Sequence, residues 1–341
     1  EHAKAVASHL GTQHTELYVS ADDALAVVPK LSAIWDEPFS DSSQIPTYLV
    51  SRLTRQSVTV SLSGDGGDEL FGGYNRYTTA MRIWDHARHV PRPLRTMLGR
   101  VMTTPAAATA ARAVAGVLPE RVRPLGFVDR LPKVGRLLLE DSAEGMYQRL
   151  IAGGGDAREL LRGDFDDHAL AGWEATDWPD FRQFMMYADT LNYLPDDILV
   201  KVDRASMAVS LETRAPFLDY RVAEYAWRLP MSARIRNGVG KHIIREILER
   251  YVPRSLTDRP KMGFAMPVSS WLSGALRPWA ESLLAADRLD REGLFDPIHV
   301  QSLWRDYLAG RTGLQDALWS ILMFQAWWEE NRPASPRGGL S

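Results

Sequence analysis

The chain of 341 residues is long enough to bury a sizeable hydrophobic core, in one large domain or two ordinary ones. Hydrophobic residues make up 45% and charged residues 24%, and the net charge of -3 gives no reason to expect a nucleic-acid or membrane partner. The absence of cysteine excludes disulfides, thiolate metal sites and cysteine nucleophiles. No apolar run reaches the roughly 18 residues of a membrane-spanning helix, so we expect a cytoplasmic protein.

The first 62 residues predict an alternation of helices and strands. The chain opens inside an amphipathic pattern rather than at a cap, which is typical of a fragment edge. Gly11 suits the end of a first helix, and Ser20 suits the cap of a second. The predicted elements are a helix over 1–10, a strand over 15–19, a helix from 20 towards 35, a polar loop over 36–43, a helix over 47–53 and a strand over 57–62.

The last of these strands alternates strictly, which places Val58, Val60 and Leu62 on one face. Helices that alternate with strands are typical of a parallel α/β sheet. Two strands do not complete such a sheet, so we expect the remaining strands before Glu1. Further along, the pattern is helical and irregular from 81 to 178, and 314–328 predicts a core-facing helix.

A glycine-rich acidic turn follows the strand. The backbone N–H groups of its glycines can surround an anion, and a helix that starts near Asp68 adds partial positive charge. Three carboxylates in one turn would repel bare phosphate but not phosphate with Mg²⁺, because the metal takes oxygen ligands from both. The alternative is a plain connection whose aspartates only cap the helix. The glycines are Gly64, Gly66 and Gly67, and the carboxylates are Asp65, Asp68 and Glu69.

Three ordered strings resemble glutamine-dependent (class B) asparagine synthetases. They are Leu62–Tyr74 (LSGDGGDELFGGY), Leu194–Asp219, which begins LPDDILVKVDRASM and ends LETRAPFLD, and Arg259–Pro267 (RPKMGFAMP). The resemblance covers 1–328 and is weakest between 81 and 181. The chain is thus similar to the C-terminal synthetase domain of that family, truncated at its N-terminus.

The resemblance implies a carbon–nitrogen ligase that uses ATP and Mg²⁺. Members of the family activate the side-chain carboxylate of aspartate as β-aspartyl-AMP, and ammonia then attacks the acyl carbon to give asparagine. The ammonia comes from a glutaminase domain with an N-terminal cysteine, which is absent from this chain. A metal or a fixed ammonium placed where negative charge develops lowers the barrier of such a reaction.

The resemblance also implies roles for individual residues. Asp65 matches an acidic position needed for adenylate formation, and Asp68 matches a Mg²⁺ ligand. Lys261 matches a lysine that stabilises charge on the reacting phosphate and acyl groups; without the resemblance it would be interpreted as a surface lysine in a turn. Ser63 and Gly64 match the ATP-contacting pair, and Gly66 and Gly67 extend the same nucleotide-binding turn.

Two departures from the family stand out. The family's Ser-Gly-Gly-x-Asp-Ser loop, which binds the pyrophosphate part of ATP, is absent from this sequence and is expected before Glu1. The glutaminase cysteine is absent as well. We therefore expect the chain alone to hydrolyse no glutamine and to make little or no asparagine. Release of pyrophosphate with ATP, Mg²⁺, aspartate and ammonia is the measurement that would contradict this expectation.

The implied fold is a Rossmann-like α/β fold, that of the adenine-nucleotide α-hydrolases (PP-loop ATP pyrophosphatases), truncated and joined to a mainly α-helical remainder. The nucleotide is expected at the carboxyl ends of the strands. The synthetase domain is expected over 1–330, with a residual sheet part over 1–80, a variable helical region over 81–180, a helical part of the active site over 181–330 and a disordered tail over 331–341.

Two basic residues of the second string have open roles. Lys201 and Arg204 lie on one predicted helix face and either meet a substrate carboxylate or AMP, or hold Glu212 and Asp219. Asp197 precedes Lys201 by four residues, a spacing that favours an ion pair.

Four further questions stay open. Glu212 and Arg214 are candidates for a buried ion pair that positions the site. The substrate can be another carboxylate, as in β-lactam synthetases, lasso-peptide cyclases and amidotransferases of surface-sugar pathways, and an adenylation exchange assay across acids would discriminate. The alternative from a different functional class is that this chain is a non-catalytic nucleotide-binding module. The oligomeric state is open, with a homodimer possible.

Overall fold

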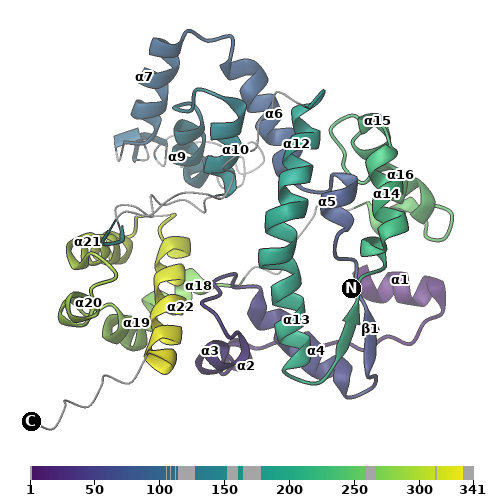
Figure 1. Cartoon of the computed structure of the whole chain (residues 1–341), viewed down its shortest axis with the longest axis horizontal. Helices are drawn as coiled ribbons and strands as arrows, with labels where there is room; N and C mark the ends of the chain where they lie inside the picture. The colour runs from purple at the N-terminus through teal and green to yellow at the C-terminus, as the bar shows by residue number, and fades with distance from the viewer. Residues whose placement is uncertain are drawn as a thin grey trace, which may run out of the picture. The chain divides into compact units, whose positions relative to one another are not determined.

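The structure is a computed structural model, and it describes residues 2–104, 106–107, 109–111, 113, 127–151, 160–163, 178–258, 266–311 and 313–332. The chain divides into two compact units (Figure 1). The first comprises Glu1–Tyr74, Met186–Ser270 and Ser320–Ser341, and the second comprises Asn75–Met185 and Trp271–Trp319. Among the described residues, no helix has the length and apolar character that crossing a bilayer requires.

The second unit is built from helices. Its helices α7 and α9 pack closely because each carries a glycine at the contact, and a Cβ on Gly99 would lie 2.7 Å from the carbonyl oxygen of Gly135. The predicted irregular helical region is mainly helical where it is described, with a β-bridge from Leu161 to Phe295 as an exception. The helices are α6 Asn75–Ala87, α7 Arg92–Met102, α9 Phe127–Leu137, α10 Ala143–Ile151, α19 Arg277–Leu283, α20 Ala286–Glu292 and α21 Pro297–Leu308, and the division between the units falls within α12 Phe181–Ala188, α18 Val268–Ser273 and α22 Gln315–Asn331.

The first unit combines helices with a small sheet. An eleven-residue π-helix that contains Pro195, η3 Asp189–Leu199, leads directly into α13 Val200–Met207, and α13 packs against both α4 and β2. Wide helical turns of this kind are rare and occur often at functional sites. The other elements are α1 His2–Leu10, α2 Ala21–Leu25, η1 Val28–Lys30, α3 Leu31–Ile34, α4 Gln44–Arg55, β1 Val60–Leu62, α5 Gly67–Phe71, β2 Glu212–Arg214, η4 Pro216–Leu218, α14 Tyr220–Arg228, α15 Met231–Arg234, α16 His242–Leu248 and α17 Arg254–Thr257.

Local sequence signals predicted several helix ends correctly. The helix over 1–10 is confirmed as α1, and Gly11 follows it with a left-handed φ of 66°. Ser20 caps α2 in a reciprocal capping box with Asp23. The continuous helix predicted towards residue 35 is wrong, because the segment breaks into α2, η1 and α3 around Pro29.

The sheet has two parallel strands, β1 and β2 (Figure 1). Val60 pairs with Glu212, and the hydroxyls of Ser61 and Thr213 lie 3.1 Å apart. Beyond the strands, the backbone N–H of Ser63 donates to the carbonyl of Arg214 at 2.8 Å. The predicted parallel α/β arrangement is therefore confirmed as a small parallel sheet in a mainly helical structure.

The strand predicted over 15–19 is wrong. Leu17, Tyr18 and Val19 are exposed, and the segment has no strand assignment. An extended segment becomes a strand only when a neighbouring strand satisfies its backbone groups, and β1 pairs with 212–214 instead. The strand predicted over 57–62 is shorter than expected, and Val60 and Leu62 on its apolar face are exposed.

The core-facing helix predicted over 314–328 is confirmed by α22, in which Leu318, Ile321 and Leu322 are at most 3% exposed. Other predictions fall outside the described residues. They are the glycine loop within 152–159, the segment 259–265, most of the tail 331–341, and parts of the alanine-rich stretch near 106–115.

One arginine of the first unit lies in the core. Arg234, at the end of α15, is 0% exposed, and its guanidinium lies 4.9 Å from the centre of the Trp227 ring. None of its three side-chain nitrogens has a hydrogen-bond partner among the described residues. Burial lowers the pKa of Arg234 to about 10. An unpaired cation in the interior costs free energy, and the aromatic ring offsets only part of that cost.

We expect the substitution Arg234→Met to raise the free energy of unfolding by roughly 1 kcal/mol, since a methionine fills the same space without a buried charge. Urea denaturation monitored by circular dichroism measures this change. Arg228→Met, on the exposed face of α14, is the matched control and should change stability by less than about 0.5 kcal/mol. A loss of stability in Arg234→Met would show that the guanidinium has an acceptor outside the described residues.

Candidate active site

The acidic glycine turn after β1 depends on two glycines with left-handed backbones. Gly66 is buried with φ of 83°, and a Cβ there would collide with Leu218. Gly72 ends α5 with φ of 71°, and a Cβ there would lie 2.6 Å from Ile235. Any other residue would strain both positions. Because α5 has only five residues, the helix dipole that the sequence suggested contributes little here.

The three carboxylates of the turn have separate surroundings. Asp65 lines a cavity, whereas the Oδ1 atom of Asp68 lies 3.2 Å from the Nζ atom of Lys241. Glu69 is 1% exposed and accepts a hydrogen bond of 2.5 Å from the hydroxyl of Tyr74. Burial raises the pKa of Glu69, and the bond from Tyr74 opposes this effect. The three carboxylates that follow one another in this turn therefore lie in different surroundings, and Glu69 faces the core.

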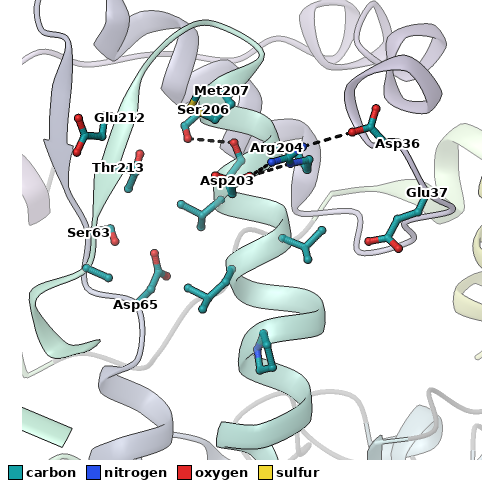
Figure 2. Close-up of a pocket in the computed structure, with 15 residues that line it drawn as sticks. Asp36, Glu37, Ser63, Asp65, Asp203, Arg204, Ser206, Met207, Glu212 and Thr213 are labelled. Carbon is teal, nitrogen blue, oxygen red and sulfur yellow. Dashed lines mark hydrogen bonds and ion pairs between the residues drawn. The ribbon is translucent and has the colours of Figure 1, made fainter. Parts of the chain in front are cut away.

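The cavity lies beside the carboxyl ends of β1 and β2 (Figure 2) and has a volume of about 790 Å³. The strand ends contribute one side, the π-helix and α13 contribute another, and the loop before α4 contributes two carboxylates. The Oγ atom of Ser63 is buried at this site and has no hydrogen-bond partner among the described residues. The lining residues are Asp36, Glu37, Ser63, Asp65, Pro195, Leu199, Val200, Val202, Asp203, Arg204, Ser206, Met207, Glu212, Thr213 and Ala215.

The cavity lining is strongly acidic. Arg204 is its one basic residue among the described residues, and it is hydrogen-bonded to Asp203 and, at 3.3 Å, to Asp36 (Figure 2). A bare polyphosphate would be repelled by such a lining, whereas a cation or a metal-bound anion would be accepted. The carboxylates are Asp36, Glu37, Asp65, Asp203 and Glu212.

The part of the chain that the structure describes contains no group of three or more histidine, aspartate or glutamate side chains that could hold a metal ion by itself. This is compatible with Mg²⁺, which is usually held by one or two carboxylates together with substrate phosphates and waters. The carboxylates of the cavity lining are oxygen donors of the kind that Mg²⁺ takes from proteins.

The structure brings together only some of the predicted site residues. Ser63 and Asp65 line the cavity, and Gly66 and Gly67 are buried in the turn beside it. Asp68 is not among the described lining residues. Lys261 lies outside the described residues. The catalytic, nucleotide-binding and metal-binding roles stay predictions.

The two basic residues with open roles have different partners from those considered. Lys201 does not line the cavity and is 2.5 Å from Asp41 and 3.6 Å from Asp197, which confirms the pair at four-residue spacing. The prediction that Lys201 and Arg204 hold Glu212 and Asp219 is wrong, because those carboxylates bind Arg214 at 2.7 Å and Arg221 at 2.7 Å instead.

The Glu212–Arg214 ion pair exists but is not buried, since its side chains are 55% and 64% exposed. On a β-strand, residues two apart lie on the same face, and this face is open to solvent. Such a pair contributes little stability.

Lys241 is a site residue that the sequence analysis missed. It has a left-handed φ of 57° at the start of α16, and its backbone N–H donates to the carbonyl of Phe71 at 2.9 Å. A Cβ on the preceding Gly240 would collide with the carbonyl oxygen of Gly72. This close contact places the ammonium of Lys241 against Asp68. The signal in the sequence was the string Gly238-Val239-Gly240-Lys241, a glycine turn that opens a helix with a lysine.

Residues 1–329 match the asparagine synthase family. The chain belongs to that family. A Mycobacterium tuberculosis protein (strain H37Rv) named as a glutamine-hydrolysing asparagine synthetase is 34% identical over 334 residues, which are 95% of this chain and 47% of that protein.

Two other members of the asparagine synthase family show how the similarity is distributed. Asparagine synthetase 1 of Bacillus subtilis is 29% identical over 336 residues, which are 95% of this chain and 49% of that protein. The human asparagine synthetase is 39% identical over 75 residues, 21% of this chain and 13% of that protein. The chain thus spans about half the length of the bacterial relatives that it matches.

We expect Gly240→Ala to lower the free energy of unfolding by roughly 3 kcal/mol, because the added methyl group collides with the backbone of Gly72. The midpoint of urea denaturation measures this loss. Gly64→Ala is the matched control, since a Cβ there meets nothing within 4 Å. Equal stability of the two variants would mean that the contact between the Lys241 turn and the acidic turn is not formed.

Proposed function

We propose that this chain is the part of an ATP-dependent amide-forming enzyme that activates aspartate as β-aspartyl-AMP, from which ammonia forms asparagine. The observation that carries the proposal is the acidic cavity at the carboxyl ends of two parallel strands, with the unpaired hydroxyl of Ser63 inside it. Relatives over 95% of the chain are named glutamine-hydrolysing asparagine synthetases, and we infer that the ammonia comes from glutamine.

We further propose that the small sheet belongs to a Rossmann-like adenine-nucleotide α-hydrolase fold, and that 1–330 form its synthetase domain. Open parallel sheets bind nucleotides outside the carboxyl ends of their strands, and the cavity lies at that position. The volume of about 790 Å³ is within the usual range for a small-molecule site.

In this proposal Ser63, Gly64, Gly66 and Gly67 bind the nucleotide. The hydroxyl of Ser63 supplies a donor, and the glycines allow close approach of the backbone to phosphate oxygens. The role of Asp68 is to bind Mg²⁺ that arrives with ATP. Bound there, the metal would offset negative charge on the phosphates of an otherwise acidic site.

The proposed reaction has two substitutions. A side-chain carboxylate oxygen of aspartate attacks the α-phosphorus of ATP, and the bond to the pyrophosphate leaving group breaks. Ammonia then attacks the acyl carbon, the bond to AMP breaks, and the nitrogen loses a proton. Asp65 faces the cavity where both steps would occur, and Lys261 is proposed to stabilise the charge that develops on phosphate and acyl oxygens.

The test is a set of two measurements on the chain and on a longer polypeptide that contains it. Calorimetric titration with ATP and Mg²⁺ reports binding, and aspartate-dependent exchange of pyrophosphate into ATP reports adenylate formation. We expect Asp65→Asn to lower the exchange rate at least about 100-fold while ATP binding changes much less, since the carboxylate acts on the reacting atoms.

The control is Asp85→Asn, which removes one partner of an exposed pair with Arg88 and should leave both measurements unchanged. Nucleotide binding without exchange for any acid in either polypeptide would favour a non-catalytic nucleotide-binding module. Faster exchange with another carboxylic acid than with aspartate would retain the chemistry and reject the substrate. No binding of ATP with Mg²⁺ by the longer polypeptide would reject the proposal.

A further inference from the structure

A partly buried charge cluster lies on the side of α13 that does not line the cavity. Lys201 is 8% exposed, and its ammonium lies 2.5 Å from a carboxylate oxygen of Asp41 and 3.6 Å from one of Asp197, whose side chains are each 25% exposed. Asp197 is on the preceding π-helix, one turn away, whereas Asp41 is 160 residues away in the sequence. A buried ammonium requires such partners, since removal of one leaves an uncompensated charge.

Asp41 belongs to the loop over 36–43, and the start of this loop is part of the cavity lining. Asp36 and Glu37 line the cavity directly (Figure 2). The first part of the loop is held by the ring nitrogen of Trp327, which donates to the carbonyl of Asp36 at 2.9 Å, and by stacking of Trp35 on Phe39 at 5.8 Å.

The second part of the loop is held through Asp41. Its carboxylate accepts hydrogen bonds of 2.8 Å from both the backbone N–H and the hydroxyl of Ser43, at the start of α4. The same carboxylate accepts from Lys201 on α13, and α4 packs against α13. One side chain therefore joins the loop, the start of α4 and the helix that forms the opposite side of the cavity.

We propose that Asp41, Lys201 and Asp197 are positioning residues that hold the loop over 36–43 as a wall of the cavity, and that binding of one proton by this cluster controls how tightly the loop is held. The inference concerns the shape of the cavity and does not depend on which substrate occupies it.

The charge balance of the cluster supports proton control. Two carboxylates share one ammonium, so the fully ionised cluster carries one negative charge in a half-buried place, and a single proton makes it neutral. The Oδ1 atom of Asp197, 3.6 Å from the Lys201 ammonium, is buried and accepts no hydrogen bond from the described residues. Among the described residues, the charged groups that act most on Asp197 of η3 are Asp41 of the loop and Lys201 of α13, and Lys201 also acts on Asp41.

The pKa directions give the sign of the effect. Burial, with repulsion from Asp41, raises the pKa of Asp197 to about 6 despite attraction by Lys201. Burial would also raise the pKa of Asp41, but Lys201 and Ser43 bring it below its ordinary value. Asp197 thus binds the shared proton. When the loop is closed against α13, Asp197 binds this proton more strongly than it does when the loop opens and the carboxylate is hydrated. The closed arrangement of the loop therefore loses stability as the pH rises through about 6.

The experiment is hydrogen exchange of the backbone amides of Ser43, Gln44 and Ile45 in the full chain, corrected for the intrinsic pH dependence of exchange. We expect the opening equilibrium of this segment to increase about tenfold between about pH 5 and about pH 7. In Asp197→Asn, whose amide does not titrate, this pH dependence should disappear while the fold is retained. In Lys201→Met, exchange should be faster than in the parent throughout the range.

The matched control is Glu224→Gln, which removes the acid of an exposed pair with Arg228 in the same unit and should leave the loop exchange unchanged. A purely structural role of Asp197 would alter the degree of protection but not its slope with pH. The proposal is overturned if Asp197→Asn retains the parent's pH dependence, or if a folded Lys201→Met protein protects the loop as the parent does. If Lys201→Met does not fold, the pH dependence of loop exchange in Asp197→Asn alone tests the proposal.

Discussion

The parallel pairing of β1 with β2 is the constraint on which the site depends. Three residue pairs and the bond from the Ser63 amide to the Arg214 carbonyl bring together segments about 150 residues apart in the sequence. Parallel strands end on the same side, so the glycine turn after β1 and the segment after β2 open onto one cavity. If the pairing were shifted by one residue, Ser63 and Asp65 would face different neighbours, and the cavity lining would change.

Negative charge is the second organising feature of the first unit. The cavity lining collects five carboxylates and one arginine, so it keeps a net negative charge even though Arg204 binds Asp203 and Asp36. Outside the lining, Asp68 contacts Lys241, Glu69 accepts a hydrogen bond from Tyr74, and Asp41 shares Lys201 with Asp197. Such a site disfavours a bare polyphosphate and favours one that is accompanied by a divalent cation. This preference agrees with the ATP-dependent chemistry proposed for this chain.

Several elements that depend on nearby residues were predicted correctly, and elements that depend on distant partners were not. The capping box of Ser20, the end of α1 at Gly11 and the buried stripe of α22 were predicted correctly, because each depends on residues within two or three turns of one another. The segment 15–19 has strand-forming residues but no neighbouring strand, and it stays outside the sheet. The partner of β1 was not predicted, since Glu212–Arg214 is only three residues long and carries charges at both ends.

The sequence by itself determined the family, the acidic glycine turn and a few helices such as α1 and α22, because long ordered motifs and local capping signals need no knowledge of distant contacts. Only the tertiary structure decided which charged groups meet. Lys201 was predicted to pair with Asp197 from spacing alone, but its shorter contact is with Asp41, 160 residues away. Likewise, the contact of Lys241 with Asp68 follows from close packing of Gly240 on Gly72. Such pairs are set by the packing of distant segments, which no local pattern encodes.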